Sequence, residues 1–242
     1  MILALEMKKT KRTGLIPAFL AGALAASAFP VLNIAFRTEL FTSQDLPPVD
    51  ILLQGNWDML ATFHSFLAIL GACILYHTEF ANRAIEKLYM LPVSQGKVFF
   101  CKNLLLLLLF LPVFLIEDGF LLFCAWHWFP GKDPGLEILL QNTAFSIAAI
   151  LPVLLLSTLI ASFAKNMWVS LGIGVVCMFM GQMTVSYEAV FSKVYTFCLP
   201  YRCLLSSSAW EDIFPILGIC AAESVLLGAV KIFLLKIRRT PV

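Results

Sequence analysis

Three acidic residues lie inside long apolar segments, where an ionised side chain has few ordinary roles. Glu117 and Asp118 fall in an apolar run near residues 103–123, and Glu223 lies near the middle of a run at 214–235. Burying a charge at such depth costs several kcal/mol, so it usually marks a partner or a pathway. These carboxyl groups suit contacts to a cationic ligand. Hydrogen bonding to a neighbouring helix, or protonation in apolar surroundings, is the plainer interpretation, and we favour it for Glu223.

The geometry of a helix separates two of these acids. Glu117 and Asp118 are neighbours in the chain, so their side chains point about 100° apart and cannot face one spot. His64 lies in another apolar run, near residues 57–76. We interpret it as a packing residue that makes a hydrogen bond, rather than as a proton relay.

The sequence lacks the motifs of a self-contained enzyme. It contains no Gly-x-x-x-x-Gly-Lys-Ser/Thr loop, no His-Glu-x-x-His and no Gly-x-Ser-x-Gly. Its three histidines are far apart, and its seven cysteines show no paired metal-ligand spacing. We therefore expect no catalytic residue and no metal site. For Cys198 and Cys203, a disulfide and two free thiols both remain open, and free thiols are the plainer expectation.

Six long apolar runs must position these side chains. Hydrophobic residues make up 60% of the 242-residue chain and charged residues 13%. A soluble domain of this size could not bury so much apolar surface. About 20 apolar residues cross the hydrocarbon core as a helix. We therefore predict an all-α, polytopic integral membrane protein in which residues 1–242 form one domain with six transmembrane helices, near residues 14–36, 57–76, 103–123, 138–164, 167–186 and 214–235. The first run also fits a cleaved signal peptide, although it continues apolar to Phe36.

Basic residues concentrate on one predicted side of the membrane. With six spans both termini share a side, and 13 of the 17 Lys and Arg residues fall there. The excess predicts cytoplasmic N and C termini, with the first 13 residues in the cytoplasm. Basic ends near a membrane suit its anionic inner leaflet, so they indicate lipid contact, and we expect no nucleic acid partner.

The cytoplasmic segment after the second span has two faces. One is apolar, with Phe80, Ala81, Ala84, Ile85 and Leu88, and the other is polar, with Glu79, Asn82, Arg83, Glu86 and Lys87. Glu79 is placed to pair with Arg83 one turn on, Pro92 ends the helix, and Ser94 is placed to cap the next one. A helix lying on the lipid surface and a helix docked on a cytoplasmic partner both fit this pattern.

Three stretches resemble a known family. Residues 79–83 with Leu91-Pro92-Val93-Ser94 and on to Lys102 resemble the coupling loop of type-2 ATP-binding-cassette exporter permeases. The opening Glu6-Met7-Lys8-Lys9-Thr10-Lys11-Arg12-Thr13 resembles that of lantibiotic-immunity permeases of the gallidermin and nisin type, and residues 111–117 resemble their Pro-rich, Glu-bearing third span. The loop here carries Gln95 after the serine, where family members often have a basic residue.

The resemblance implies a mechanism and a set of partners. The chain would be a single six-span permease domain in the bacterial plasma membrane, without its own nucleotide site. Two copies of a cytoplasmic ATPase would bind ATP and Mg²⁺, and a second permease chain, the same or different, would complete the exporter. The coupling-helix residues would be Glu79, Phe80, Arg83, Glu86, Lys87 and Pro92.

The implied cargo is a cationic antimicrobial peptide, expelled from the membrane to give immunity or resistance. Glu117, Asp118 and Glu223 would then be its candidate intramembrane contacts. A type-2 exporter for another cargo (a drug, a lipid or an ion) and a gradient-driven six-span carrier are the alternatives.

Two outer segments complete the prediction. The connection from Tyr187 to Trp210 is aromatic, which fits an interfacial belt, and in related exporters this region dips back into the membrane as short helices. The loop from Arg37 to Trp57 is acidic and proline-containing. It would attract basic peptides through long-range charge, or it is an ordinary solvated loop.

Overall fold

The computed structural model describes residues 2–11, 13–81, 94–185 and 190–237, and these residues are almost entirely helical. Six helices are long and apolar enough to cross a membrane. They are α2 (Leu15–Phe36), α4 (Pro48–Ala81), α6 (Gln95–Trp128), α7 (Leu136–Ala161), α8 (Met167–Thr184) and α10 (Trp210–Ile237). The prediction of an all-α membrane protein with six spanning helices is therefore confirmed within the described residues.

Within the described residues, four short helices accompany the long ones. They are α1 (Ile2–Thr10), α3 (Thr38–Thr42), α9 (Val190–Val194) and the 3₁₀ helix η1 (Thr196–Tyr201). The helical character of α9 and η1 agrees with the short helices that related exporters have in this outer segment. The sequence reasoning did not predict α1 or α3, and it ended the second span at Tyr76, whereas α4 runs on to Ala81 and begins nine residues earlier, at Pro48.

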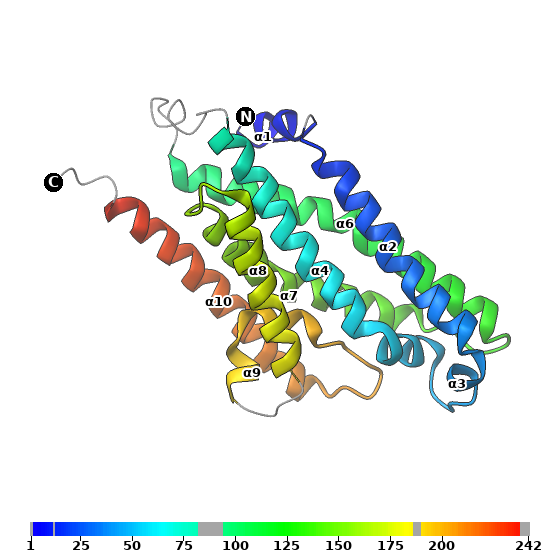
Figure 1. Ribbon diagram of the computed structural model, residues 1–242. Helices are drawn as coiled ribbons and strands as arrows, with labels where there is room; N and C mark the ends of the chain where they lie inside the picture. The colour runs from blue at the N-terminus through cyan, green and yellow to red at the C-terminus, as the bar shows by residue number, and fades with distance from the viewer. Residues whose placement is uncertain (1, 12, 82–93, 186–189, 238–242) are drawn as a thin grey trace.

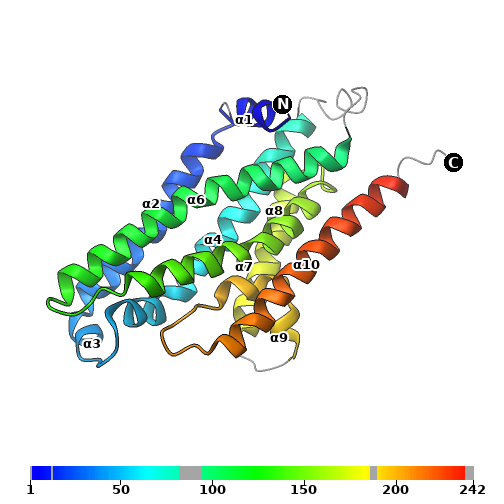
Figure 2. The same ribbon diagram turned by 180° about the vertical axis from the view of Figure 1, so that it is seen from behind.

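The six long helices form one tilted bundle (Figures 1 and 2). Helix α2 packs against α6 and α4, α7 packs against α4 and α10, and α8 packs mainly against α4. Both views place α1 and the C-terminal end of α10 at one end of the bundle, with α3 and α9 at the other. We call these the terminal end and the α3 end. An even number of crossings requires this arrangement of the two termini.

Aromatic and aliphatic side chains fill the centre between α2, α4, α6 and α7. Phe19 of α2 meets Phe110 of α6 edge to face, with ring centroids 5.3 Å apart. Both rings are fully buried, as is Leu106 one turn before Phe110. Outward-facing positions on α8 and α10 remain apolar, for example Trp168 and Phe233, which suits helices whose outer faces meet lipid chains.

Helix starts follow local chemistry only in part. The break between α7 and α8 lies at Asn166, as the sequence indicated, and the Asn166 side chain accepts a hydrogen bond from the Trp168 N–H at 3.0 Å. Ser94 does occupy the N-cap of α6, but its side chain makes no capping hydrogen bond. The expected capping bond of Ser94 is therefore wrong, although the helix start is right.

At the α3 end, η1 lies directly on α8. A Cβ added to Gly181 would stand 2.6 Å from the Phe197 carbonyl oxygen, a distance that no side chain tolerates against backbone. Glycine at this position therefore allows the 3₁₀ segment to approach the helix, and η1 is buried between α8, α7 and α4.

Candidate functional site

A cluster of four charged side chains joins three helices at the terminal end. It consists of Glu6 and Lys9 from α1, Glu79 from the last turn of α4 and Lys102 from the second turn of α6; we call it the Lys102 cluster. Lys102 Nζ donates to Glu6 Oε2 at 2.9 Å and lies 2.8 Å from Glu79 Oε1. Lys9 Nζ lies 2.6 Å from Glu6 Oε1 and 3.5 Å from Glu79 Oε1. Two cations thus balance two carboxylates.

The cluster is largely shielded from solvent. Lys102 is 1% exposed, Glu6 2% and Glu79 4%, whereas the Lys9 side chain keeps 44% of its surface open. The Lys102 ammonium also lies 5.3 Å from the centre of the Tyr76 ring, a cation–π contact. Buried charges of this kind persist only when they are paired and hydrogen-bonded, so each member depends on the others.

At Glu6 and Lys9 of α1, the paired charges shift the pKa more than burial does. Burial alone raises the pKa of Glu6, but the charges and hydrogen bonds of Lys102 and Lys9 outweigh it and bring the pKa below its ordinary value. Burial lowers the pKa of Lys9, and the carboxylates of Glu6 and then Glu79 more than restore it, so its pKa lies above the ordinary value. Both groups are charged at neutral pH.

The position of Glu79 differs from the sequence expectation. Periodicity placed Glu79 on the polar face of its helix, but its carboxylate points into the bundle and binds Lys102 and Lys9. The reason is tertiary: α4 continues past the apolar run, and a charged partner from α6 reaches its last turn. Phe80 packs against the main apolar core. Four further predicted coupling residues lie outside the described residues: Arg83, Glu86, Lys87 and Pro92. The expected pairing of Glu79 with Arg83 therefore stays a prediction.

A second polar pair lies deep between α4 and α6. His64 Nε2 and Glu117 Oε2 are 2.6 Å apart, and both residues are at least 97% shielded. The His64 ring also meets Phe114 edge to face, with centroids 4.8 Å apart. This confirms the interpretation of His64 as a hydrogen-bonded packing residue. The other Glu117 oxygen, Oε1, has no hydrogen-bond partner among the described residues, so it retains an unused acceptor.

The remaining intramembrane acids face different helices. Asp118 accepts a hydrogen bond from the Thr143 hydroxyl of α7 at 2.7 Å, so it points away from Glu117, as helix geometry predicted. Both carboxyl oxygens of Glu223 on α10 are shielded from solvent. Neither Glu223 oxygen has a described partner at hydrogen-bonding geometry. The three predicted acids therefore do not converge on one site.

The outer segment is tied down at the α3 end by several polar contacts. Trp57 Nε1 of α4 donates to the Pro200 carbonyl at 3.0 Å. The Leu204 N–H donates to Asn142 Oδ1 at 2.9 Å, and the Ser206 N–H donates to Asp50 Oδ1 at 3.1 Å. Cys198 and Cys203 are both free thiols, so no disulfide holds the segment. Hydrogen bonds from α4 and α7 supply its anchors instead.

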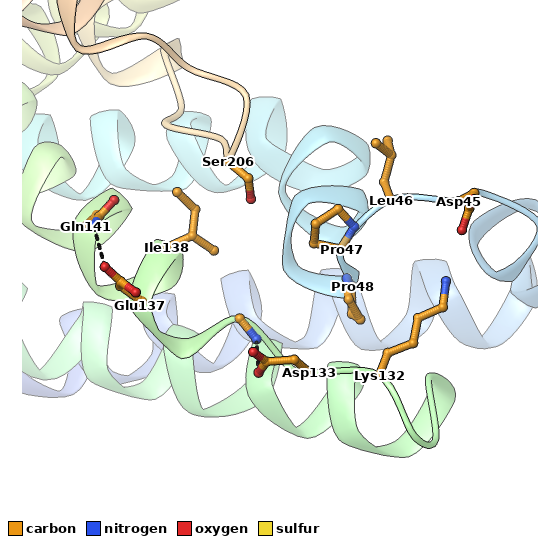
Figure 3. Close-up of a pocket in the computed structure, with 11 residues that line it drawn as sticks. Asp45, Leu46, Pro47, Pro48, Lys132, Asp133, Glu137, Ile138, Gln141 and Ser206 are labelled. Atoms are coloured by element: carbon orange, nitrogen blue, oxygen red, sulfur yellow. Dashed lines mark hydrogen bonds between the residues drawn. The ribbon is translucent and has the colours of Figure 1, made fainter.

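A polar pocket of about 700 Å³ opens at the same end (Figure 3). The loop before α4, the loop between α6 and α7 and the segment before α10 surround it, and Asp45, Asp133, Glu137 and Lys132 are among the residues that line it. Three carboxylates against one ammonium make it acidic. Asp133 accepts from the Gly135 N–H. Glu137 accepts from Gln141, as Figure 3 shows.

Sequence reasoning missed the Lys102 cluster, although weak signals existed. Glu6 begins the opening stretch that resembles lantibiotic-immunity permeases, and Lys102 lies just before the third predicted span, near residues 103–123. Neither signal says that the two side chains meet. Within the described residues, no three His, Cys, Asp or Glu side chains gather as metal ligands would.

Comparison with protein families yields one match. The model of the ABC-2 family transporter protein matches residues 2–181, about three quarters of the chain. A search of curated proteins and a search of solved structures each gave no match. The matched region contains α1, the Lys102 cluster, the His64–Glu117 pair, the first four spanning helices and most of α8. Members are membrane-embedded transport subunits that generally lack an ATPase of their own and work with an ATP-binding-cassette ATPase. This chain, a multi-pass membrane protein, belongs to the ABC-2 transporter family.

Proposed function

We propose that this permease subunit gives a bacterial cell immunity or resistance to cationic lantibiotic-type peptides by expelling them from the plasma membrane. A cytoplasmic ATPase in two copies binds ATP and Mg²⁺ and drives the cycle, and a second permease chain, the same or different, completes the exporter. Both termini lie in the cytoplasm, and the segment that follows α4 contacts the ATPase.

The Lys102 cluster is the observation that carries this proposal. It links the lantibiotic-immunity-type opening, through Glu6, to the end of α4 that leads into the predicted coupling segment. Glu79 is the cluster member closest in sequence to that segment. Force applied by an ATPase beyond Ala81 would therefore reach α1 and α6 through paired charges as well as through the backbone.

The distribution of acids supports a cationic cargo. At the α3 end, which faces outward in this orientation, Asp45, Asp133 and Glu137 line an open pocket. A mouth with an excess of one sign of charge raises the local concentration of oppositely charged ligands. Deeper in the membrane, Glu117 Oε1 remains an unused acceptor. An exporter of a neutral drug or an anionic lipid would not require this acidic mouth.

Two linked measurements test the proposal. Cells carrying this chain with its native ATPase should tolerate nisin better than cells lacking the chain, and the ATPase should co-purify with it. Reversing the charge of Arg83 or Glu86 should weaken co-purification and lower tolerance, because both lie on the predicted partner-facing side. Lys132→Glu, at the α3 end, is the matched control and should leave co-purification unchanged.

The two measurements separate the parts of the proposal. If both charge reversals leave the complex and the tolerance intact, the coupling assignment is wrong. If the complex forms but nisin tolerance does not depend on the chain, the assignment of a lantibiotic cargo is wrong. The chain would then belong to a type-2 exporter of another cargo, such as a drug, a lipid or an ion.

A further inference from the structure

An apolar groove runs along the membrane-facing side of the bundle where α6, α7 and α10 meet. Its volume is about 560 Å³, and its lining includes Phe100, Leu104 and Leu107 of α6, Leu155 of α7, and Val225 and Ile232 of α10. None of the described residues that line it is charged. We call it the α6–α10 groove.

The polar side chains in this groove use their hydrogen bonds inside the protein. Asn103 donates to the Phe99 carbonyl at 2.9 Å and accepts from the Thr158 hydroxyl at 3.0 Å. Ser224 donates to the Cys220 carbonyl at 2.7 Å. The surface left for an occupant is therefore hydrocarbon, which favours a hydrocarbon chain over a polar ligand.

The length of the groove fits one leaflet. Its lining on α10 runs from Ser224 to Ile232, eight residues along the helix, or about 12 Å at 1.5 Å per residue. Half of the hydrocarbon core of a bilayer measures about 15 Å. The two helices converge towards the terminal end, where a Cβ on Gly96 would lie 4.0 Å from Leu235 Cδ1. The groove thus lies in the leaflet nearest the two termini.

Two lysines flank that end of the groove. Lys97 is one turn before Phe100 on α6, and Lys236 is one turn after Ile232 on α10. Both side chains are exposed, and neither pairs with a carboxylate among the described residues. A hydrocarbon slot with basic residues at its interfacial end matches a lipid whose head group carries negative charge.

We propose that the α6–α10 groove binds an anionic phospholipid, with an acyl chain against Phe100, Leu107 and Ile232 and its phosphate between Lys97 and Lys236. This site is independent of the cargo and of the ATPase. A bound lipid here would fill the space between α6 and α10, which otherwise touch only sparsely.

Native mass spectrometry of the purified full chain tests this site, with phosphatidylglycerol and phosphatidylcholine of identical acyl chains as probes. The chain should retain phosphatidylglycerol in preference to phosphatidylcholine. Lys97→Gln with Lys236→Gln should weaken phosphatidylglycerol retention about 25-fold, about fivefold for each lysine. Ala229→Trp fills the groove and should abolish retention. Lys132→Gln and Leu226→Trp, which change a distant lysine and a lipid-facing residue outside the groove lining, are the controls and should retain the lipid as the unaltered chain does.

Several outcomes would overturn the site. Equal retention of the two lipids would show that the lipid charge does not contribute to binding. Unchanged retention in Ala229→Trp would show that the lipid does not bind in the groove. If Ala229→Trp splits a dimer of this chain while phosphatidylglycerol stays bound, a second copy occupies the groove instead. The lysine pair is exposed, so its variant still decides the question if Ala229→Trp fails to fold.

Discussion

Lys102 Nζ lies 2.9 Å from Glu6 Oε2, although 96 residues separate the two in the chain. This contact holds α1 against the beginning of α6, and the same ammonium holds the last turn of α4 through Glu79. Helix α1 is short, and a nine-residue helix is marginal in isolation. Its position therefore depends on the buried charges, and it should follow any movement of the α4–α6 ends.

Replacing the central cation should be costly. Lys102→Met leaves Glu6 and Glu79 buried beside each other, with Lys9 as their one cationic partner among the described residues, so we expect a loss of about 3–5 kcal/mol in the free energy of unfolding. Thermal unfolding of the purified chain in detergent measures this loss. Lys8→Met, an exposed position on α1, is the control and should change the midpoint little.

A second variant distinguishes charge from packing. If unpaired carboxylates cause the loss, then adding Glu6→Gln and Glu79→Gln to Lys102→Met should recover part of the stability, because the neutral amides no longer need a cation. A triple variant that unfolds as readily as Lys102→Met alone would show that the packing of the lysine stem matters more than its charge.

The cluster should also make stability depend on pH. The pKa of Glu6 lies below its ordinary value of 4.5 in the folded chain. Its contribution is therefore fully present above the unfolded pKa and is lost as pH falls through the lower folded pKa. As pH falls below about 5, Glu6→Gln should flatten the dependence of the unfolding midpoint on pH. Glu211→Gln, an exposed change in the first turn of α10, should leave that dependence as it is; an unaltered slope in Glu6→Gln would contradict the assignment.

The sequence predicted the spanning helices well because hydrophobicity over 20 residues is a property of each segment alone. It also separated Glu117 from Asp118, because adjacent helix positions diverge. It could not pair His64 with Glu117 or Lys102 with Glu6, since such pairs depend on which helices pack together and in what register. Glu79 illustrates this limit. The periodicity of its own helix places it on a polar face, and it is buried because α6 brings Lys102 against that face.

The His64–Glu117 pair offers a test of cargo contact against structure. Glu117→Gln keeps a hydrogen-bonding group beside His64 but removes the negative charge, whereas Glu117→Leu removes both. If the pair is structural, Glu117→Leu should lower stability by about 1–3 kcal/mol, and Glu117→Gln should keep most of the stability and of the nisin tolerance. If the charge also contacts cargo, Glu117→Gln should lose tolerance at nearly unchanged stability. Thr143→Val on α7 removes the hydroxyl that binds Asp118 of α6 and the Leu139 carbonyl, and it is the control for losing a polar contact away from His64.

The approach of η1 to α8 predicts a position-specific effect of a single methyl group. In Gly181→Ala the added Cβ would stand 2.6 Å from the Phe197 carbonyl oxygen, so η1 must move away from α8. We expect a destabilisation of about 1–3 kcal/mol from this overpacking. Gly172 lies on the same helix with no atom within 4 Å of an added Cβ, so Gly172→Ala should be neutral or slightly stabilising.

Trypsin added from the α3 side gives an independent measurement of the same change. Lys193 lies in α9, next to η1, and displacement of η1 should speed cleavage there in Gly181→Ala while Gly172→Ala cleaves at the rate of the unaltered chain. Anchors such as the Trp57 bond to the Pro200 carbonyl would restrain but not prevent the displacement, since each contributes only about 1 kcal/mol. Equal cleavage of the two alanine variants would mean that η1 does not rest on Gly181, and the buried outer segment would then need a different support.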